Sequence, residues 1–169
     1  MNVSTVVSAA VLVGLAAACA PRPAPPPRPD ENAIRAALTA ELAKAPQVMM
    51  AKDTVGLANL FTPDATWILP DASAFTGRAA IVSGAKGFYT TFASMTMGPM
   101  VIDKLAVVSD SEAVTFSHGN YTMTVKGKKP ESRVNPFADL WKKGADGVWR
   151  IAYEVNADGP AAPAAPPRH

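Results

Sequence analysis

The sequence predicts an α+β domain in which about three helices precede a curved antiparallel sheet and pack on one of its faces. Apolar residues recur at helical spacing in the first part of the chain after residue 30 and alternate at strand spacing in the second part. Turn-forming residues separate the strand segments. Helices followed by a strand meander are typical of an α+β architecture.

The first predicted helix begins at Asp30, whose side chain is suited to cap the free N–H groups of a first turn. Ile34, Leu38, Leu42 and Ala45 follow at fourfold spacing and form one apolar stripe. Pro46 is expected to kink or divide this helix, because proline lacks the N–H and clashes with the preceding turn.

A second helical segment is expected from Val48 towards Phe61, with Thr62-Pro63-Asp64 as the turn that follows it. Residues 65–69 then form a short predicted strand of mainly apolar residues. Pro70 ends that strand, because proline supplies no N–H to a sheet ladder.

A third helix is expected after Gly77, beyond a loop at residues 71–76. Its apolar face contains Ala80, Ile81, Gly84, Phe88 and Phe92. The remaining chain alternates between strand and turn, and the predicted strands are Val101 to Val108, Glu112 to Val125, Arg133 to Lys143 and Val148 to Asn156. Segments rich in Gly, Ser, Asp and Pro join them, which is the composition of hairpin turns.

The front of the chain predicts export. Residues 6–18 are an uninterrupted run of small and apolar residues that ends at Cys19, the only cysteine. This run has the length of a secretory signal and is shorter than the roughly 20 residues that span a bilayer. Residues 16–19, Ala-Ala-Ala-Cys, resemble the lipobox of bacterial lipoproteins, which implies cleavage before Cys19, lipidation of its thiol and a membrane anchor.

Two alternatives stay open for this segment. Cleavage after Ala18 or Ala20 would give a soluble periplasmic or secreted protein, and a retained helix would anchor the chain directly. In the lipoprotein interpretation, Ala20 resembles the sorting signals that favour an outer membrane, where the protein would face the periplasm.

The chain accordingly divides into a signal peptide (1–18), a lipidation cysteine with a Pro-rich tether (19–29), the α+β domain (30–158) and a disordered Ala/Pro tail (159–169). The formal net charge is +2, and the basic residues are scattered among acidic ones. That pattern argues against nucleic acid as a partner. No metal-ligand cluster, phosphate-binding glycine loop or Ser-His-Asp arrangement is visible, so neither a metal nor a cofactor is expected.

Two motifs make the domain resemble a known superfamily. Phe61-Thr62-Pro63-Asp64-Ala65-Thr66-Trp67 is followed by Gly77-Arg78-Ala79-Ala80-Ile81, and Asp139-Leu140-Trp141-Lys142-Lys143 by Asp146-Gly147-Val148-Trp149-Arg150-Ile151. With the order of elements, they resemble the nuclear-transport-factor-2-like superfamily, in its SnoaL-like and ketosteroid-isomerase-like branch. The resemblance implies a cone-shaped fold with an interior pocket. It implies no single activity, since this fold contains isomerases, cyclases, dehydratases, hydrolases and binding domains.

The resemblance to the ketosteroid isomerases is partial at their functional positions. Leu69 stands before Pro70, where those enzymes carry the carboxylate base, and no tyrosine precedes Tyr89, although those enzymes place one on the first helix. Asp139 does have a counterpart, an aspartate kept protonated as a hydrogen-bond donor. Steroid isomerisation is therefore not expected.

Asp139 is nevertheless a candidate acid–base residue. Strand alternation places it on one face with Asn135, Phe137 and Trp141. Inside a cavity, burial would raise the pKa of its carboxyl and make it a proton donor. The alternative is a surface aspartate paired with a cross-strand base such as Arg150.

His118 is the second candidate. Apolar residues share its face before Gly119 and change parity after it, and a bulge at His118 or Gly119 would bring both sets to one side. Such a bulge would aim His118 at the apolar side, within reach of Asp139. The alternatives are a histidine hydrogen-bonded in the core or placed at the rim.

A cone fold predicts an apolar pocket with few polar groups. Its expected lining is Trp67, Leu69, Phe88, Phe92, Phe137 and Trp141. Three functions stay open. They are an exported domain that binds a small apolar molecule, an isomerase, cyclase or dehydratase that uses Asp139 and His118, and an interaction module that forms a homodimer through the open sheet face. The membrane, through lipidated Cys19, is the other expected partner.

Overall fold

The computed structural model describes residues 29–159. The predicted signal peptide, Cys19 and nearly all of the tether and tail lie outside these residues. The elements in chain order are α1 (Glu31–Leu42), α2 (Ala45–Met50), α3 (Thr54–Asn59), β1 (Phe61–Ile68), β2 (Ala74–Thr76), α4 (Arg78–Thr90), β3 (Phe92–Ser109), β4 (Glu112–Val125), β5 (Glu131–Lys143) and β6 (Trp149–Asn156). Within the described residues, no helix is long and apolar enough to cross a membrane.

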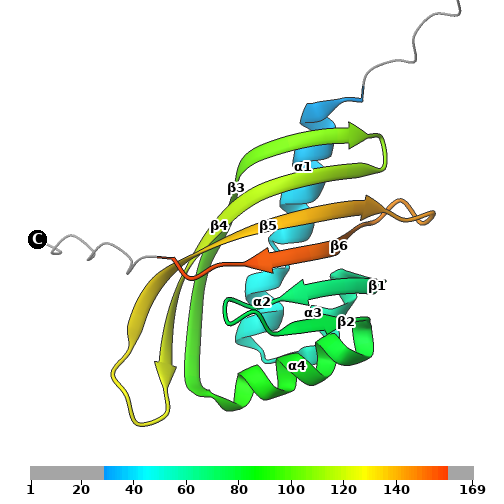
Figure 1. Cartoon of the computed structure of the whole chain (residues 1–169). Helices are drawn as coiled ribbons and strands as arrows, with labels where there is room; N and C mark the ends of the chain where they lie inside the picture. The colour runs from blue at the N-terminus through cyan, green and yellow to red at the C-terminus, as the bar shows by residue number, and fades with distance from the viewer. Residues whose placement is uncertain (1–28, 160–169) are drawn as a thin grey trace, which may run out of the picture.

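The strands form one six-stranded sheet in the order β2-β1-β6-β5-β4-β3. From β3 to β6 it is the predicted antiparallel meander. The sheet as a whole is mixed, because β1 pairs parallel to β6 and antiparallel to β2. Figure 1 shows α1 crossing the strands of the meander, with α4 beside β1 and β2. The predicted α+β class is confirmed, and the expectation of a purely antiparallel sheet is wrong at β1, which no hairpin joins to β6.

The helix starts follow from local capping. The Asp30 carboxylate accepts two backbone N–H groups of the first turn of α1, at 3.0 and 3.1 Å. Pro46 divides the helical region, because it lies in the first turn of α2, where a missing N–H has little cost. The second predicted helix is in fact two. The chain breaks at Lys52, where φ is 55°, and Asp53 then caps α3 by accepting the N–H of Gly56 at 2.8 Å.

Three strands begin earlier than predicted, and β5 does so by only two residues, at Glu131. β1 begins at Phe61, so residues 62–64 belong to the strand, where the pairing with β6 is interrupted between Phe61 and Thr66. β3 begins at Phe92, directly after α4, and pairs with β4 from that residue onwards. Phe92 is therefore not on a helix. Pairing with the long strand β4 extends β3 through residues whose local pattern gave no strand signal.

The core lies between the helices and the inner face of the sheet. The apolar stripe of α1 is buried as predicted, at Ile34, Leu38 and Leu42. It packs with buried aromatic side chains from the sheet, which are Phe61, Trp67, Phe92, Phe137, Trp141 and Trp149. Each large apolar side chain taken from water contributes about 1.5–3 kcal/mol. These contacts hold the helices against the face on which the site is built.

Candidate functional site

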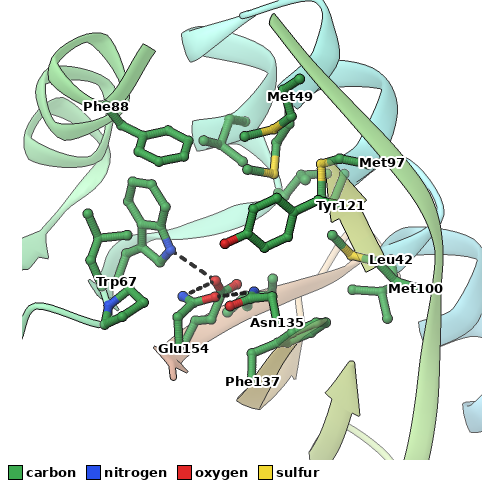
Figure 2. A pocket seen from close by; sticks show the side chains of 18 of the residues that line it. Leu42, Met49, Trp67, Phe88, Met97, Met100, Tyr121, Asn135, Phe137 and Glu154 are labelled. Carbon is green, nitrogen blue, oxygen red and sulfur yellow. Dashed lines mark hydrogen bonds between the residues drawn. The ribbon is translucent and has the colours of Figure 1, made fainter. Parts of the chain in front are cut away.

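A pocket with a volume of about 120 Å³ lies between the helices and the inner face of the sheet (Figure 2). Four of the six predicted lining residues are there, Trp67, Leu69, Phe88 and Phe137. The other two are buried elsewhere. Phe92 packs beneath the Lys52 ammonium group, which is 4.6 Å from its ring centroid, and Trp141 is enclosed in the core behind the pocket.

Methionines form much of the pocket wall. Five of the seven methionines of the chain line it, namely Met49, Met95, Met97, Met100 and Met123. They come from three elements, since Met49 lies on α2, the next three on β3, and Met123 on β4 directly opposite Met95. Methionine is unbranched and polarizable, so a wall of this kind adapts to the shape of an apolar guest.

The polar end of the pocket is built around Glu154 of β6. Its Oε1 atom accepts hydrogen bonds from Trp67 Nε1 at 2.9 Å and from Asn156 Nδ2 at 2.7 Å. Asn156 is itself held, because its Nδ2 also donates to the Ile68 carbonyl at 3.1 Å and its Oδ1 accepts from Asn135 Nδ2 at 3.0 Å. Figure 2 shows the hydrogen bond from Trp67 to Glu154 in this network. The network fixes the orientation of the Glu154 carboxyl group.

Asp139 of β5 is directly opposite Glu154 in the strand register but lies deeper. It is 1% exposed and does not line the pocket. Its Oδ2 accepts from Thr115 Oγ1 at 3.2 Å, and the same Oγ1 accepts from Trp141 Nε1 at 2.9 Å. Of the two expectations for Asp139, the structure agrees with the interior one, but the residue is enclosed in the core and does not line the cavity. The alternative ion pair with Arg150 is wrong, because Arg150 binds Asp146 at 2.7 Å.

Both of the opposed carboxyl groups have raised pKa values. Burial raises the pKa of Asp139 well above its ordinary value, the neighbouring Glu154 carboxylate raises it further, and the Thr115 hydrogen bond lowers it. Burial also raises the pKa of Glu154, whereas the hydrogen bonds from Asn156 and Trp67 lower it. Because like charges at neighbouring sites disfavour double ionisation, we infer that Asp139 keeps its proton while Glu154 ionises.

His118 lies on the opposite, outer face of the sheet. Its Nδ1 is 2.8 Å from Asp103 Oδ2. The predicted bulge is absent, because the pairing of β4 with β5 continues without a shift through Ser117, His118 and Gly119. The structure therefore does not bring His118 and Asp139 together. Phe116, on the same face as His118, is 54% exposed. The inner face of β4 carries small residues at these positions, since large side chains of β5 fill the space.

A bulge does occur in β6, where the sequence pattern predicts none. Trp141 pairs with Ile151 but Leu140 pairs with Tyr153, so β6 contains one extra residue. The extra residue reverses which side chains of β6 point inward. Glu154 therefore faces the pocket, whereas Tyr153 is 42% exposed. The sequence does not mark Glu154 as a pocket residue, because the alternation of Ile151, Tyr153 and Val155 predicts an outward glutamate. No local signal marks the bulge.

A family model described as a SnoaL-like domain matches residues 42–153. A putative scytalone dehydratase from Novosphingobium aromaticivorans has 17% identity and a TM-score of 0.68, over 78% of this chain and 88% of that chain. A ketosteroid isomerase-like protein from Erwinia carotovora atroseptica has 18% identity and a TM-score of 0.64, over 73% and 94%.

A third structure, the hexachlorocyclohexane dehydrochlorinase LinA-type3 from Novosphingobium barchaimii, has 15% identity and a TM-score of 0.68, over 79% of this chain and 92% of that chain. At these identities the likenesses show the fold alone. Comparison with the curated proteins finds no match. The family model covers the greater part of the chain, and its match agrees with the fold, so this chain belongs to the SnoaL-like family of the nuclear-transport-factor-2-like superfamily.

Proposed function

We propose that this chain binds a small, mostly apolar molecule in the pocket between the helices and the sheet. The observation that supports this proposal is the pocket itself. Thioether and aromatic walls surround a volume of about 120 Å³, and polar groups lie at one end. An engineered apolar cavity of roughly 150 Å³ binds benzene, so the volume is suited to a body of about one ring. The fixed network at Glu154 supplies the orienting polar contact that such sites use.

The enzyme alternative has less support in the geometry. Its two acid–base residues, Asp139 and His118, are on opposite faces of the sheet, and only Asp139 is turned towards the interior. General acid–base catalysis needs both groups within hydrogen-bond reach of one substrate. The present arrangement therefore favours binding over that mechanism.

Fluorobenzene is a suitable probe, because its fluorine signal reports binding directly by NMR. We expect saturable binding to the wild type and its loss in Met97→Trp, which fills the pocket. Val101→Trp is the matched control, since Val101 is on the same strand but is 46% exposed and does not line the pocket. Equal binding by both variants, or none by the wild type, would contradict the proposal.

We further propose that the domain works from a membrane through lipidated Cys19. The support is the apolar run that ends at the only cysteine, followed by the Pro-rich segment. Wild-type chain should partition with membranes, and Cys19→Ser should remain unlipidated in the same fractionation. Recovery of the wild type as a soluble chain beginning at Pro21 would remove this part of the proposal.

Pairing of two copies through the outer sheet face is the second candidate function. One row in the register, Phe116, Ala138 and Val155, runs across three strands, and Phe116 and Val155 are 54% and 39% exposed. Contiguous exposed apolar side chains mark interaction surfaces. Sedimentation equilibrium should then show a dimer for the wild type and a monomer for Phe116→Glu, and a monomeric wild type would exclude this function.

A further inference from the structure

The pocket contains one acidic side chain and no basic one. Among the described residues that line it, Glu154 is the only carboxylate, and there is no Lys, Arg or His. Tyr121 is the other titratable residue, and burial raises the pKa of its phenol, so it stays neutral. The lining residues from α1, α2, α3, α4, β1 and β3 are all uncharged. A negative charge on Glu154 therefore has no protein cation beside it in the pocket.

The two oxygens of Glu154 differ in their surroundings. Oε1 accepts two N–H groups, from Trp67 and Asn156. Oε2 has no hydrogen-bond partner among the described residues, and it is not fully buried. It is therefore accessible to a molecule in the pocket. Two donors on Oε1 also stabilise the ionised form, because hydrogen bonds to a carboxylate favour its charge.

Asp139 is the titratable group that faces Glu154 from the neighbouring strand. It sits opposite Glu154 in the register, is enclosed in the core, and has an Oδ1 atom without a partner. A carboxyl group in that position is held neutral by burial. The charge of the pair consequently resides on Glu154, at the surface of the pocket.

The walls around Glu154 suit a cation with an apolar body. Figure 2 shows Trp67, Phe88, Tyr121 and Phe137 around the space that Glu154 borders. Aromatic faces attract cations, most strongly where water is excluded, and thioethers are polarizable. An uncompensated carboxylate among aromatic rings is thus complementary to a positive group.

We propose that the ligand of this pocket is an organic cation, in which a protonated amine contacts Glu154 Oε2 and an apolar body of about one ring lies against the aromatic and methionine walls. This inference rests on the proposed binding function and specifies its ligand class. The amine supplies the N–H donors that Oε2 lacks. Its charge replaces the missing protein cation.

The test compares benzylammonium with ethylbenzene, which has the same shape and no charge, and with anionic benzoate. Dissociation constants are measured by calorimetry or NMR between pH 4 and pH 8, where an alkyl amine stays protonated. At pH 8 we expect benzylammonium to bind at least about tenfold more tightly than ethylbenzene, and benzoate not to bind. The preference for the cation should shrink as the pH falls and Glu154 takes up its proton.

Glu154→Gln should abolish both the preference and its pH dependence, because the amide keeps the shape and removes the charge. Glu154→Asp should retain a preference for the cation. Asp103→Asn is the matched control, since it removes one carboxylate from the outer face and should leave the preference intact. The wild-type pH profile tests the proposal even where a Glu154 variant does not fold.

Three results would overturn the inference. Equal binding of benzylammonium and ethylbenzene by the wild type at pH 8 would do so while leaving the proposed binding function in place. A cation preference that persists unchanged in Glu154→Gln would assign the charge to another group. Failure of benzylammonium, ethylbenzene and fluorobenzene alike to bind would remove the proposed function itself.

Discussion

Asp139 and Glu154 are the same kind of group in paired positions, and their surroundings give them different roles. Asp139 is enclosed by β4 and β5, where Thr115 and Trp141 complete a buried network. Glu154 stands at the open end of the same face, where it lines the pocket. One strand spacing separates a carboxyl that belongs to the core from one that borders the pocket. Depth below the pocket surface, rather than residue type, distinguishes the two carboxyl groups.

The largest expected effect is at the closed end. Trp141→Ala removes a nearly fully buried indole and leaves Thr115 Oγ1 without its donor, so the free energy of unfolding should fall by about 3–5 kcal/mol. Urea denaturation measures this change. Glu154→Gln, at the open end, should change the same quantity by less than about 1 kcal/mol. A loss below about 1 kcal/mol in Trp141→Ala would show that the closed end is packed no more tightly than the open end.

The second prediction concerns how the free energy of unfolding depends on pH. Because the pKa of Asp139 is raised in the folded state, its contribution is fully present below the unfolded value of 3.8 and is lost as the pH rises from there through the folded pKa. Wild-type stability should therefore fall with rising pH, at up to about 1.4 kcal/mol per pH unit for one proton. Asp139→Asn should flatten most of this fall in urea titrations at several pH values. An unchanged slope would place the raised pKa elsewhere.

A smaller effect is expected at the open end, on the pKa of Glu154. Trp67→Phe keeps an aromatic wall but removes the N–H that Oε1 of Glu154 accepts. Since that hydrogen bond lowers the pKa of Glu154, its loss should move the pKa upward. Carbon-detected NMR of the side-chain carboxyl measures it. A pKa that stays or moves downward would mean that the hydrogen bond does not hold the carboxylate.

The smallest effect is expected on the outer face. His118→Gln breaks the contact with Asp103, a pair whose side chains are both partly exposed to solvent. Exposed pairs contribute little, so the free energy of unfolding should change by less than about 0.5 kcal/mol, and fluorobenzene binding should not change. Loss of fluorobenzene binding in this variant would connect the outer face to the pocket.

Much of the fold is predictable from the sequence because it depends on local chemistry. Asp30 caps α1 through its own first turn, Pro46 starts a new helix, and the alternating run of β4 gives its limits. Alternation along β5 also places Asp139 on one face with Phe137 and Trp141, and the structure buries all three. In each case the residues that decide the structure are within a few positions of the feature.

The candidate site is less predictable, because the tertiary structure decides it. The apolar pattern of β4 changes parity after Gly119, yet β4 pairs with β5 without a shift. The apolar pattern of β6 keeps one parity, yet β6 contains a bulge. A bulge forms where strand pairing and packing of the inner face require it, and a single residue then reverses which side chains point inward.

The sequence by itself determined the helix caps, the strand pattern of the meander and the aromatic character of the pocket, because these depend on neighbours along the chain. Only the tertiary structure decided that Glu154 faces the pocket and that His118 faces away from it. The physical reason is that strand register is set by contacts between residues far apart in sequence, and a shift of one residue exchanges the two faces of a strand.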